Sequence, residues 1–205
     1  DVTIVVNGKS GEQVAKVEIP ANLSGSSGWF VDLDPTPWAE TAINSMAALG
    51  VVQGVGDRKY APTAPMTRGA LATIIHRLSQ GKTDYRSAFQ DVADGQYYTQ
   101  GVAWAAQVKV VTGYSEDRFG PEDTITREQL GVMLCRYASF LGLYTKSDAK
   151  ALERFRDGGK TSGWAVDGVS WCVEKGILEG KGGNILDPGA QTTRAEVAVM
   201  FDRFI

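Results

Sequence analysis

The chain has 205 residues, of which 43% are hydrophobic and 22% charged, an ordinary composition for a globular protein with a sizeable core. Its formal net charge of -3 argues against general nucleic-acid binding, because domains of that kind are usually basic. No apolar run reaches the roughly 20 residues of a membrane-spanning helix. With His76 as the single histidine, multi-histidine metal centres and Cys–His nucleophiles have almost nothing to be built from.

The first 28 residues differ in character from the rest. Two β-rich runs, at residues 2–6 and 14–19, are separated by a glycine-containing turn and predict a hairpin. The Ser-Gly-Ser-Ser-Gly segment at 24–28 is typical of a linker. We interpret residues 1–28 as the tail of a preceding β domain plus a linker, or as a strand pair that docks on the remainder of the chain. An export signal is expected outside this sequence, because no basic segment leads into an apolar one at its start.

From residue 30 onwards, one pattern occurs three times. Each copy has an aromatic residue and an aspartate, a second aromatic residue, a glycine sixteen positions later (38 to 54, 97 to 113, 164 to 180), and a proline five positions before a Thr-Arg pair. The copies are Phe30, Asp32, Trp38, Gly54, Pro62 and Thr67-Arg68; Phe89, Asp91, Tyr97, Gly113, Pro121 and Thr126-Arg127; and Phe155, Asp157, Trp164, Gly180, Pro188 and Thr193-Arg194. They divide the chain into repeats at 29–88, 89–154 and 155–205, with an insertion at the end of the second.

Each copy predicts a helix, a loop and a second helix. In the second helices apolar residues recur at i, i+3 and i+4, as at Leu71, Ile74 and Ile75. A two-helix unit cannot bury its apolar face alone, so the three units should pack about a pseudo-threefold axis or as a short stack. The predicted fold is therefore mainly α, with three helix-loop-helix repeats behind a short N-terminal β segment. Cys172 falls in the core stripe and Cys135 beside one, and whether they form a disulfide stays open.

The second helices begin with a recognisable cap. Thr193 with Glu196 fits a capping box, and Thr126 with Gln129 fits a weaker one, whereas the first copy has Ala70 at the third helical position. The residue after each threonine is an arginine, although a cation in the first turn opposes the helix macrodipole by roughly 0.3–1 kcal/mol.

Two explanations account for these arginines, Arg68, Arg127 and Arg194. In the first, each forms an anion site together with the free backbone N–H groups of the helix N-terminus, suited to a carboxylate or phosphate. In the second, each pairs with a protein carboxylate, such as Asp32, Asp91 or Asp157, and only joins the repeats. Both remain open from the sequence.

The recurring aromatic and glycine residues have similar alternatives. Trp38, Tyr97 and Trp164 either stack on the apolar faces of sugar rings or pack in the core. The glycines at 54, 113 and 180 are expected to supply turns or helix ends with positive φ.

At these residues the chain resembles the S-layer homology (SLH) family, whose pattern is F-x-D, then W or Y at the start of the first helix, G-I/V-x-x-G, F-x-P and T-R-A-E. The resemblance covers residues 30–205 and implies a pseudo-threefold helical prism. It also implies binding of secondary cell-wall polymers, many of which carry an acidic pyruvate ketal that the T-R-A-E arginine would hold. The ligand-binding residues it implies are Arg68, Arg127, Arg194, Asp32, Asp91, Asp157, Trp38, Tyr97 and Trp164. Only the third copy keeps the full T-R-A-E motif, so unequal occupancy of the grooves is expected.

The sequence therefore predicts a non-catalytic module that anchors upstream domains of the same polypeptide to a bacterial cell wall or S-layer, outside the cell. The expected partner is an anionic cell-wall polysaccharide, with no cofactor, metal, nucleic acid or membrane insertion. A structural or self-assembly module without a saccharide site is the alternative. A hydrolase that uses some of the 24 acidic residues is a weaker one.

Overall fold

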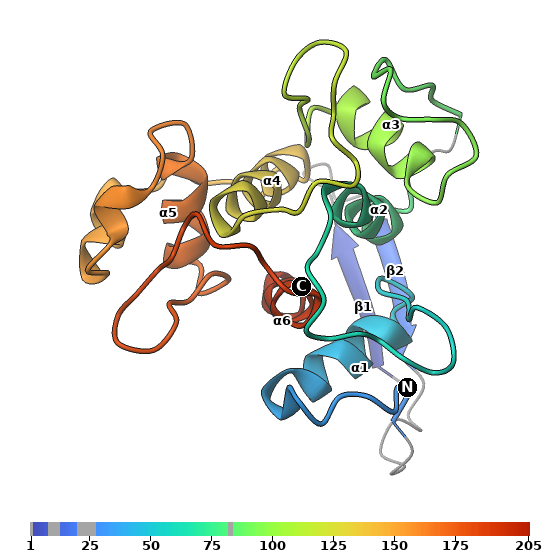
Figure 1. Ribbon diagram of the computed structural model, residues 1–205, viewed down its shortest axis with the longest axis horizontal. Helices are drawn as coiled ribbons and strands as arrows, with labels where there is room; N and C mark the ends of the chain where they lie inside the picture. Colours follow the sequence, from blue (N-terminus) through green and yellow to red (C-terminus); the bar gives the residue numbers. More distant parts are fainter. Residues whose placement is uncertain (1, 8–12, 20–27, 82–83) are drawn as a thin grey trace.

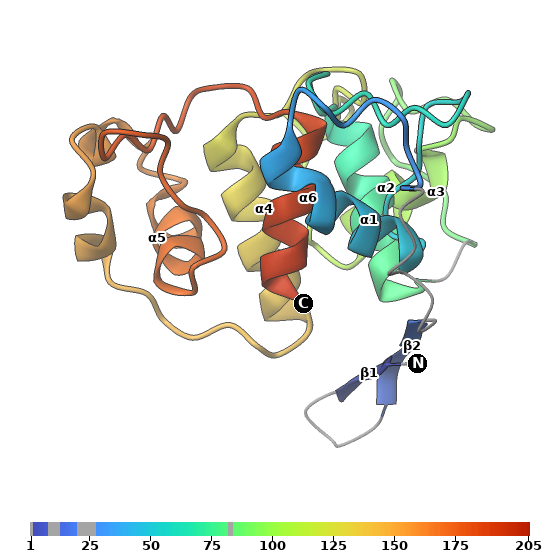
Figure 2. The same cartoon turned by 90° about the horizontal axis from the view of Figure 1, so that it is seen from below.

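The computed structural model describes residues 2–7, 13–19, 28–81 and 84–205. Strands β1 (Val2–Asn7) and β2 (Gln13–Ile19) form an antiparallel hairpin, as the two β-rich runs predict. The hairpin lies beside the end of the helical part at which the chain terminates (Figure 2). Residues 20–27, which include most of the predicted linker, lie outside the described residues.

Each repeat supplies a first and a second α-helix, which confirms the mainly α prediction. The first helices are α1 (Glu40–Ala48), α3 (Thr99–Gln107) and α5 (Val166–Glu174), and the second helices are α2 (Arg68–Ser79), α4 (Arg127–Phe140) and α6 (Arg194–Phe204). Short 3-10 turns occur at η1 (Pro37–Ala39), η2 (Ala149–Arg154) and η3 (Gly158–Lys160). The insertion at the end of the second repeat contains η2, which packs against α5.

The second helices lie around the centre of the molecule and the first helices lie outside them (Figure 1). Helix α3 packs against α2, α5 against α4, and α1 against α6. Each first helix therefore covers the second helix of the preceding repeat, and the contact between α1 and α6 joins the first repeat to the last. The apolar stripe of each second helix is buried by this exchange, as the complete burial of Leu71, Leu130 and Val197 shows.

A ring of backbone hydrogen bonds closes the arrangement about the central axis. The Met66 N–H donates to the Thr192 carbonyl at 2.8 Å, the Thr192 N–H to the Ile125 carbonyl at 3.0 Å, and the Ile125 N–H to the Met66 carbonyl at 2.9 Å. Because each repeat both donates and accepts, no repeat is terminal. The units thus form a closed pseudo-threefold prism and not an open stack.

The recurring glycines have a different role from the one expected. Positive φ occurs four residues earlier, at Gly50, Lys109 and Gly176, where the first helices end. At Gly113 a Cβ atom would lie 2.5 Å from the ring of Phe89 and 2.5 Å from the Arg118 carbonyl oxygen. The prediction of positive φ at the recurring glycines is therefore wrong. Glycine is required there because the aromatic ring at the start of each repeat packs directly on the backbone.

Cys135 and Cys172 are buried free thiols and form no disulfide. Burial raises the pKa of the Cys135 thiol to about 11, so it is protonated at neutral pH. Within the described residues, no helix is both long enough and apolar enough to span a membrane.

The packing at Gly113 predicts a stability effect. We expect Gly113→Ala to lower the free energy of unfolding by about 2 kcal/mol, because the added methyl group overlaps the Phe89 ring and a backbone carbonyl. Urea denaturation followed by circular dichroism measures the change. Gly159→Ala is the matched control, since its Cβ meets no atom within 4 Å, and its effect should stay within about 0.5 kcal/mol. Equal effects of the two substitutions would contradict this explanation.

Candidate functional site

The N-termini of the second helices are anchored in the neighbouring repeat. The Arg127 N–H donates to the Ala190 carbonyl and the Glu128 N–H to the Pro188 carbonyl, each at 2.9 Å. The N–H groups of the corresponding residues of α2 and α6 make the equivalent bonds, and the third N–H of each helix donates to the cap threonine. These three helix starts therefore lack the free N–H groups that the first explanation of the arginines required, because backbone carbonyls and the cap already use them.

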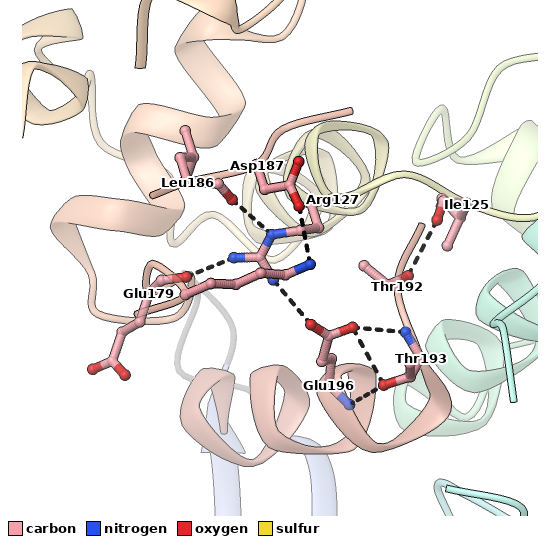
Figure 3. Close-up of polar contacts among 9 residues, drawn as sticks. Ile125, Arg127, Glu179, Leu186, Asp187, Thr192, Thr193 and Glu196 are labelled. Atoms are coloured by element: carbon pink, nitrogen blue, oxygen red, sulfur yellow. Dashed lines mark hydrogen bonds and ion pairs between the residues drawn. The ribbon is translucent and has the colours of Figure 1, made fainter. Parts of the chain in front are cut away.

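The three Thr-Arg arginines reach across to the next repeat with their side chains. The Arg127 Nε donates to the Leu186 carbonyl at 2.8 Å and its Nη2 to the Glu179 carbonyl at 2.6 Å (Figure 3). Arg68 makes the same pair of bonds to Phe119 and Thr112, at 2.9 and 3.0 Å. Arg194 bonds in the same way to Tyr60 and Gln53, at 2.8 and 2.7 Å. One edge of each guanidinium group thus joins two repeats.

Burial accompanies these contacts. The exposed fraction is 6% for Arg68 and 4% for Arg127, and this desolvation lowers the pKa of both guanidinium groups, which remain charged at neutral pH. The Arg68 guanidinium also lies over the Tyr114 ring, 4.4 Å from its centroid. The remaining nitrogen, Nη1, is the part of these arginines left to meet a ligand or a protein acid.

The aspartates that the sequence assigned to the groove hold the adjacent loop. The Asp157 carboxylate accepts the N–H groups of Leu186 and Asp187 at 2.7 and 2.8 Å, and the bond from Leu186 lowers its pKa. Asp32 and Asp91 accept the equivalent N–H groups of their own repeats. Each aspartate therefore holds a loop, and the arginine of the neighbouring repeat binds a carbonyl of that same loop. Arginine and aspartate are thus linked through the backbone and do not form an ion pair.

The recurring aromatic side chains are exposed. Trp38, Tyr97 and Trp164 are each 59% exposed, so the alternative that they pack in the core is wrong. Trp38 and Trp164 each line a cavity between the repeats.

A groove between the repeats lies beside Arg68, and another lies beside Arg127. The first, here called the Arg68 groove, is a cavity of about 480 Å³ whose lining includes Arg68, Tyr114, Arg136 and Trp164. The second, here called the Arg127 groove, is a cavity of about 400 Å³, and its lining includes Arg127, Glu179, Glu196, Arg203 and Trp38. In both, the arginine comes from one repeat, the helix face and loop from the next, and the tryptophan from the remaining one.

The residues at the third equivalent position also come together. The Arg194 Nη2 donates to the Gln53 carbonyl, and the Arg77 Nη2 donates to the Gln53 side-chain oxygen at 2.9 Å. Burial, followed by the charge of Arg194, lowers the pKa of Arg77, so two cations lie close enough to repel one another. The Tyr97 hydroxyl lies 3.4 Å from the Thr67 hydroxyl, beside the start of α2.

A second set of arginines was missed in the sequence. Arg136 and Arg203 line the two grooves, and Arg77 occupies the equivalent place on α2. Each lies nine residues after the Thr-Arg arginine (68 to 77, 127 to 136, 194 to 203), so a recurrence of fixed spacing could have revealed them. Each position therefore presents two arginines and one exposed aromatic ring. Among the described residues, no cluster of three or more histidine, cysteine or acidic side chains is placed to hold a metal ion.

Comparison with known proteins places this arrangement in a family. The family model of the S-layer homology domain matches residues 30–72, 88–130 and 154–198. The chain is 29% identical to an exoglucanase, XynX, of Acetivibrio thermocellus over 88% of its own length, and 30% identical to an amylopullulanase of Thermoanaerobacterium thermosulfurigenes over 80%. It is 25% identical to a surface-layer 125 kDa protein of Lysinibacillus sphaericus over 82%. It spans only 16%, 9% and 14% of the lengths of these relatives.

The chain belongs to the S-layer homology family, with three tandem repeats. It is a cell-surface anchoring module, and its location is extracellular, at the cell wall of a bacterium. The enzymes among its relatives match it over this module and not over most of their length.

The contacts of Arg127 predict that it is needed for stability. We expect Arg127→Ala to lower the free energy of unfolding by about 3 kcal/mol, because two carbonyl groups lose their donor and Glu196 loses its partner. Urea denaturation measures the loss, with Arg156→Ala, an exposed arginine, as the control that should change stability by less than about 0.5 kcal/mol. A loss of that smaller size for Arg127→Ala would mean that the carbonyl contacts do not hold the repeats together.

Proposed function

We propose that the module anchors its polypeptide by non-covalent binding of an acidic cell-wall polysaccharide in the grooves between repeats, without catalysis and without a cofactor. The observation that carries the proposal is the Arg68 groove. There an exposed tryptophan, Trp164, faces the same cavity as two arginines, Arg68 and Arg136. We infer that the upstream part of the same polypeptide is what the module holds at the wall.

The chemistry of the groove suits a sugar that carries a carboxylate. The Trp164 ring is held on a short loop before α5 and is free to stack on the apolar face of a pyranose. Arginine is the cation best matched to a carboxylate, because its planar donors can make paired, charge-assisted hydrogen bonds. A cavity of about 480 Å³ is within the usual range for a small-molecule site and admits a short segment of a polymer.

The resemblance to other S-layer homology modules makes a pyruvate ketal the acid that we favour. A ketal carboxylate projects from a rigid ring fused to the sugar, so stacking of the sugar on the aromatic side chain and pairing of the acid with the arginines can occur together. In this proposal Arg68, Arg127, Arg194, Trp38, Tyr97 and Trp164 are the ligand-binding residues at the three positions, and the recurring aspartates act by holding the loops that the arginines contact.

A structural module without a saccharide site is the second candidate. It is favoured by the carbonyl contacts of the three Thr-Arg arginines, which join the repeats through the protein's own groups. Alanine substitution of those arginines cannot separate the two candidates, because it would also weaken the fold. The exposed aromatic residues can, since their side chains contribute little to the core.

We expect the triple substitution of Trp38, Tyr97 and Trp164 by alanine to reduce sedimentation with purified cell-wall sacculi by about tenfold or more, through loss of stacking. The unfolding midpoint of this variant should stay near that of the wild type. Alanine substitution of three exposed apolar residues that line neither groove, Val31, Leu143 and Ile205, is the control. Purified wall polymer whose carboxylates have been reduced to alcohols should bind more weakly than the native polymer. Equal sedimentation of wild type and aromatic variant would favour the structural module.

A further inference from the structure

The two grooves differ at two equivalent positions, although the repeats that form them share the same pattern. In the Arg127 groove, the Glu196 Oε1 lies 3.4 Å from the Arg127 Nη1 (Figure 3). In the same groove, the Glu179 Oε2 lies 2.7 Å from the Arg203 Nη2. Each of its two arginines is therefore paired with a carboxylate that the protein supplies.

The corresponding partners in the Arg68 groove are neutral. Gln129 is the third residue of α4, as Glu196 is of α6, and its side-chain oxygen accepts the Thr126 N–H at 3.1 Å. Thr112 precedes Gly113 as Glu179 precedes Gly180, and its hydroxyl accepts from the Arg136 Nη1 at 3.2 Å. Arg68 and Arg136 thus keep their positive charge without an acid at either position.

Burial makes this difference matter. The side chains of Arg127 and Glu196 are only 5% and 19% exposed, so their attraction is weakly screened by solvent. A foreign carboxylate that approaches Arg127 meets the like charge of Glu196 and must compete with it for the same guanidinium nitrogen. The additional cation of this groove, Lys181, is paired with Asp187 at 3.1 Å and does not restore the excess of positive charge.

We propose that the side chain at the third position of the second helix, together with the residue before the recurring glycine, decides whether a groove accepts an acidic sugar. Gln129 and Thr112 leave the arginines of the Arg68 groove without a carboxylate at these two positions, so this groove binds an acidic sugar strongly. In the Arg127 groove, Glu196 and Glu179 take the place of the ligand's carboxylate, so this groove binds an acidic sugar weakly. At the third equivalent position, beside Arg194, the corresponding residues are Ala70 and Gln53. Neither is acidic, so by the same criterion this position also binds an acidic sugar strongly. The inference rests on the proposed function.

Reciprocal exchange of the two helix residues tests the proposal, because the chain itself uses both side chains as caps. Glutamine at 129 and glutamate at 196 each complete a capping box, so Gln129→Glu and Glu196→Gln should both preserve the helix start. Unchanged circular dichroism spectra of the variants check this, since Glu196→Gln also removes the ion pair with Arg127 and so lowers the unfolding midpoint for a separate reason. Glu153→Gln, at an exposed residue away from both grooves, is the matched charge control.

Each groove contains its own reporter, since Trp164 lines the Arg68 groove and Trp38 the Arg127 groove. Their indole N–H resonances, assigned with single Trp→Phe variants, can be followed while the protein is titrated with the 4,6-pyruvate ketal of a methyl hexopyranoside. The neutral methyl ester of the same ketal is the control ligand.

In the wild type we expect the Trp164 resonance to respond at a ketal concentration at least about tenfold lower than the Trp38 resonance. Gln129→Glu should raise the Trp164 midpoint about tenfold, and Glu196→Gln should lower the Trp38 midpoint by a similar factor. Equal midpoints in the wild type, or midpoints that the exchange leaves unchanged, would overturn this inference while the proposed function stood. If the ketal moves neither resonance, or the ester binds as well as the acid, the proposed function itself fails.

Discussion

The contact on which the structure depends is the bond from a buried arginine of one repeat to two backbone carbonyls of the next. A helix-loop-helix unit of this size cannot cover its own apolar stripe, and its loops leave carbonyl groups that need donors. Arg127 supplies two donors to Leu186 and Glu179, while Asp157 holds the same loop through its N–H groups. The arginine and the aspartate thus act on opposite sides of one loop, and the repetition of this arrangement closes the prism.

The same arginine serves the groove because a guanidinium group has two usable edges. One edge is committed to the carbonyls, which fixes the orientation of the charge and lowers the entropy cost of positioning it for a ligand. The other edge meets the cavity that the next repeat and the tryptophan of the remaining repeat complete. Since each of the two grooves combines three repeats, the proposed binding depends on closure of the prism, and a single repeat would offer no complete groove.

Divergence among the repeats then gives the grooves different charges on one scaffold. The capping position accepts either glutamine or glutamate, because both side chains can receive the N–H of the cap threonine. That freedom allows the charge beside the buried arginine to change without loss of the helix start. The third residue of the second helix, which the sequence indicates only as a helix cap, therefore also sets the charge of a cavity.

The sequence by itself determined the repeats, their helices and the choice of Arg68, Arg127 and Arg194 as special, because periodicity and spacing are local properties of the chain. It could not decide that Trp38 is exposed or that Gly113 serves close packing, since both depend on which segment lies opposite in the folded chain. Only the tertiary structure showed that backbone carbonyls use the helix N–H groups and that Glu196 pairs with Arg127. Those contacts join residues that are 52 to 133 positions apart, and their geometry exists only once the ring has closed.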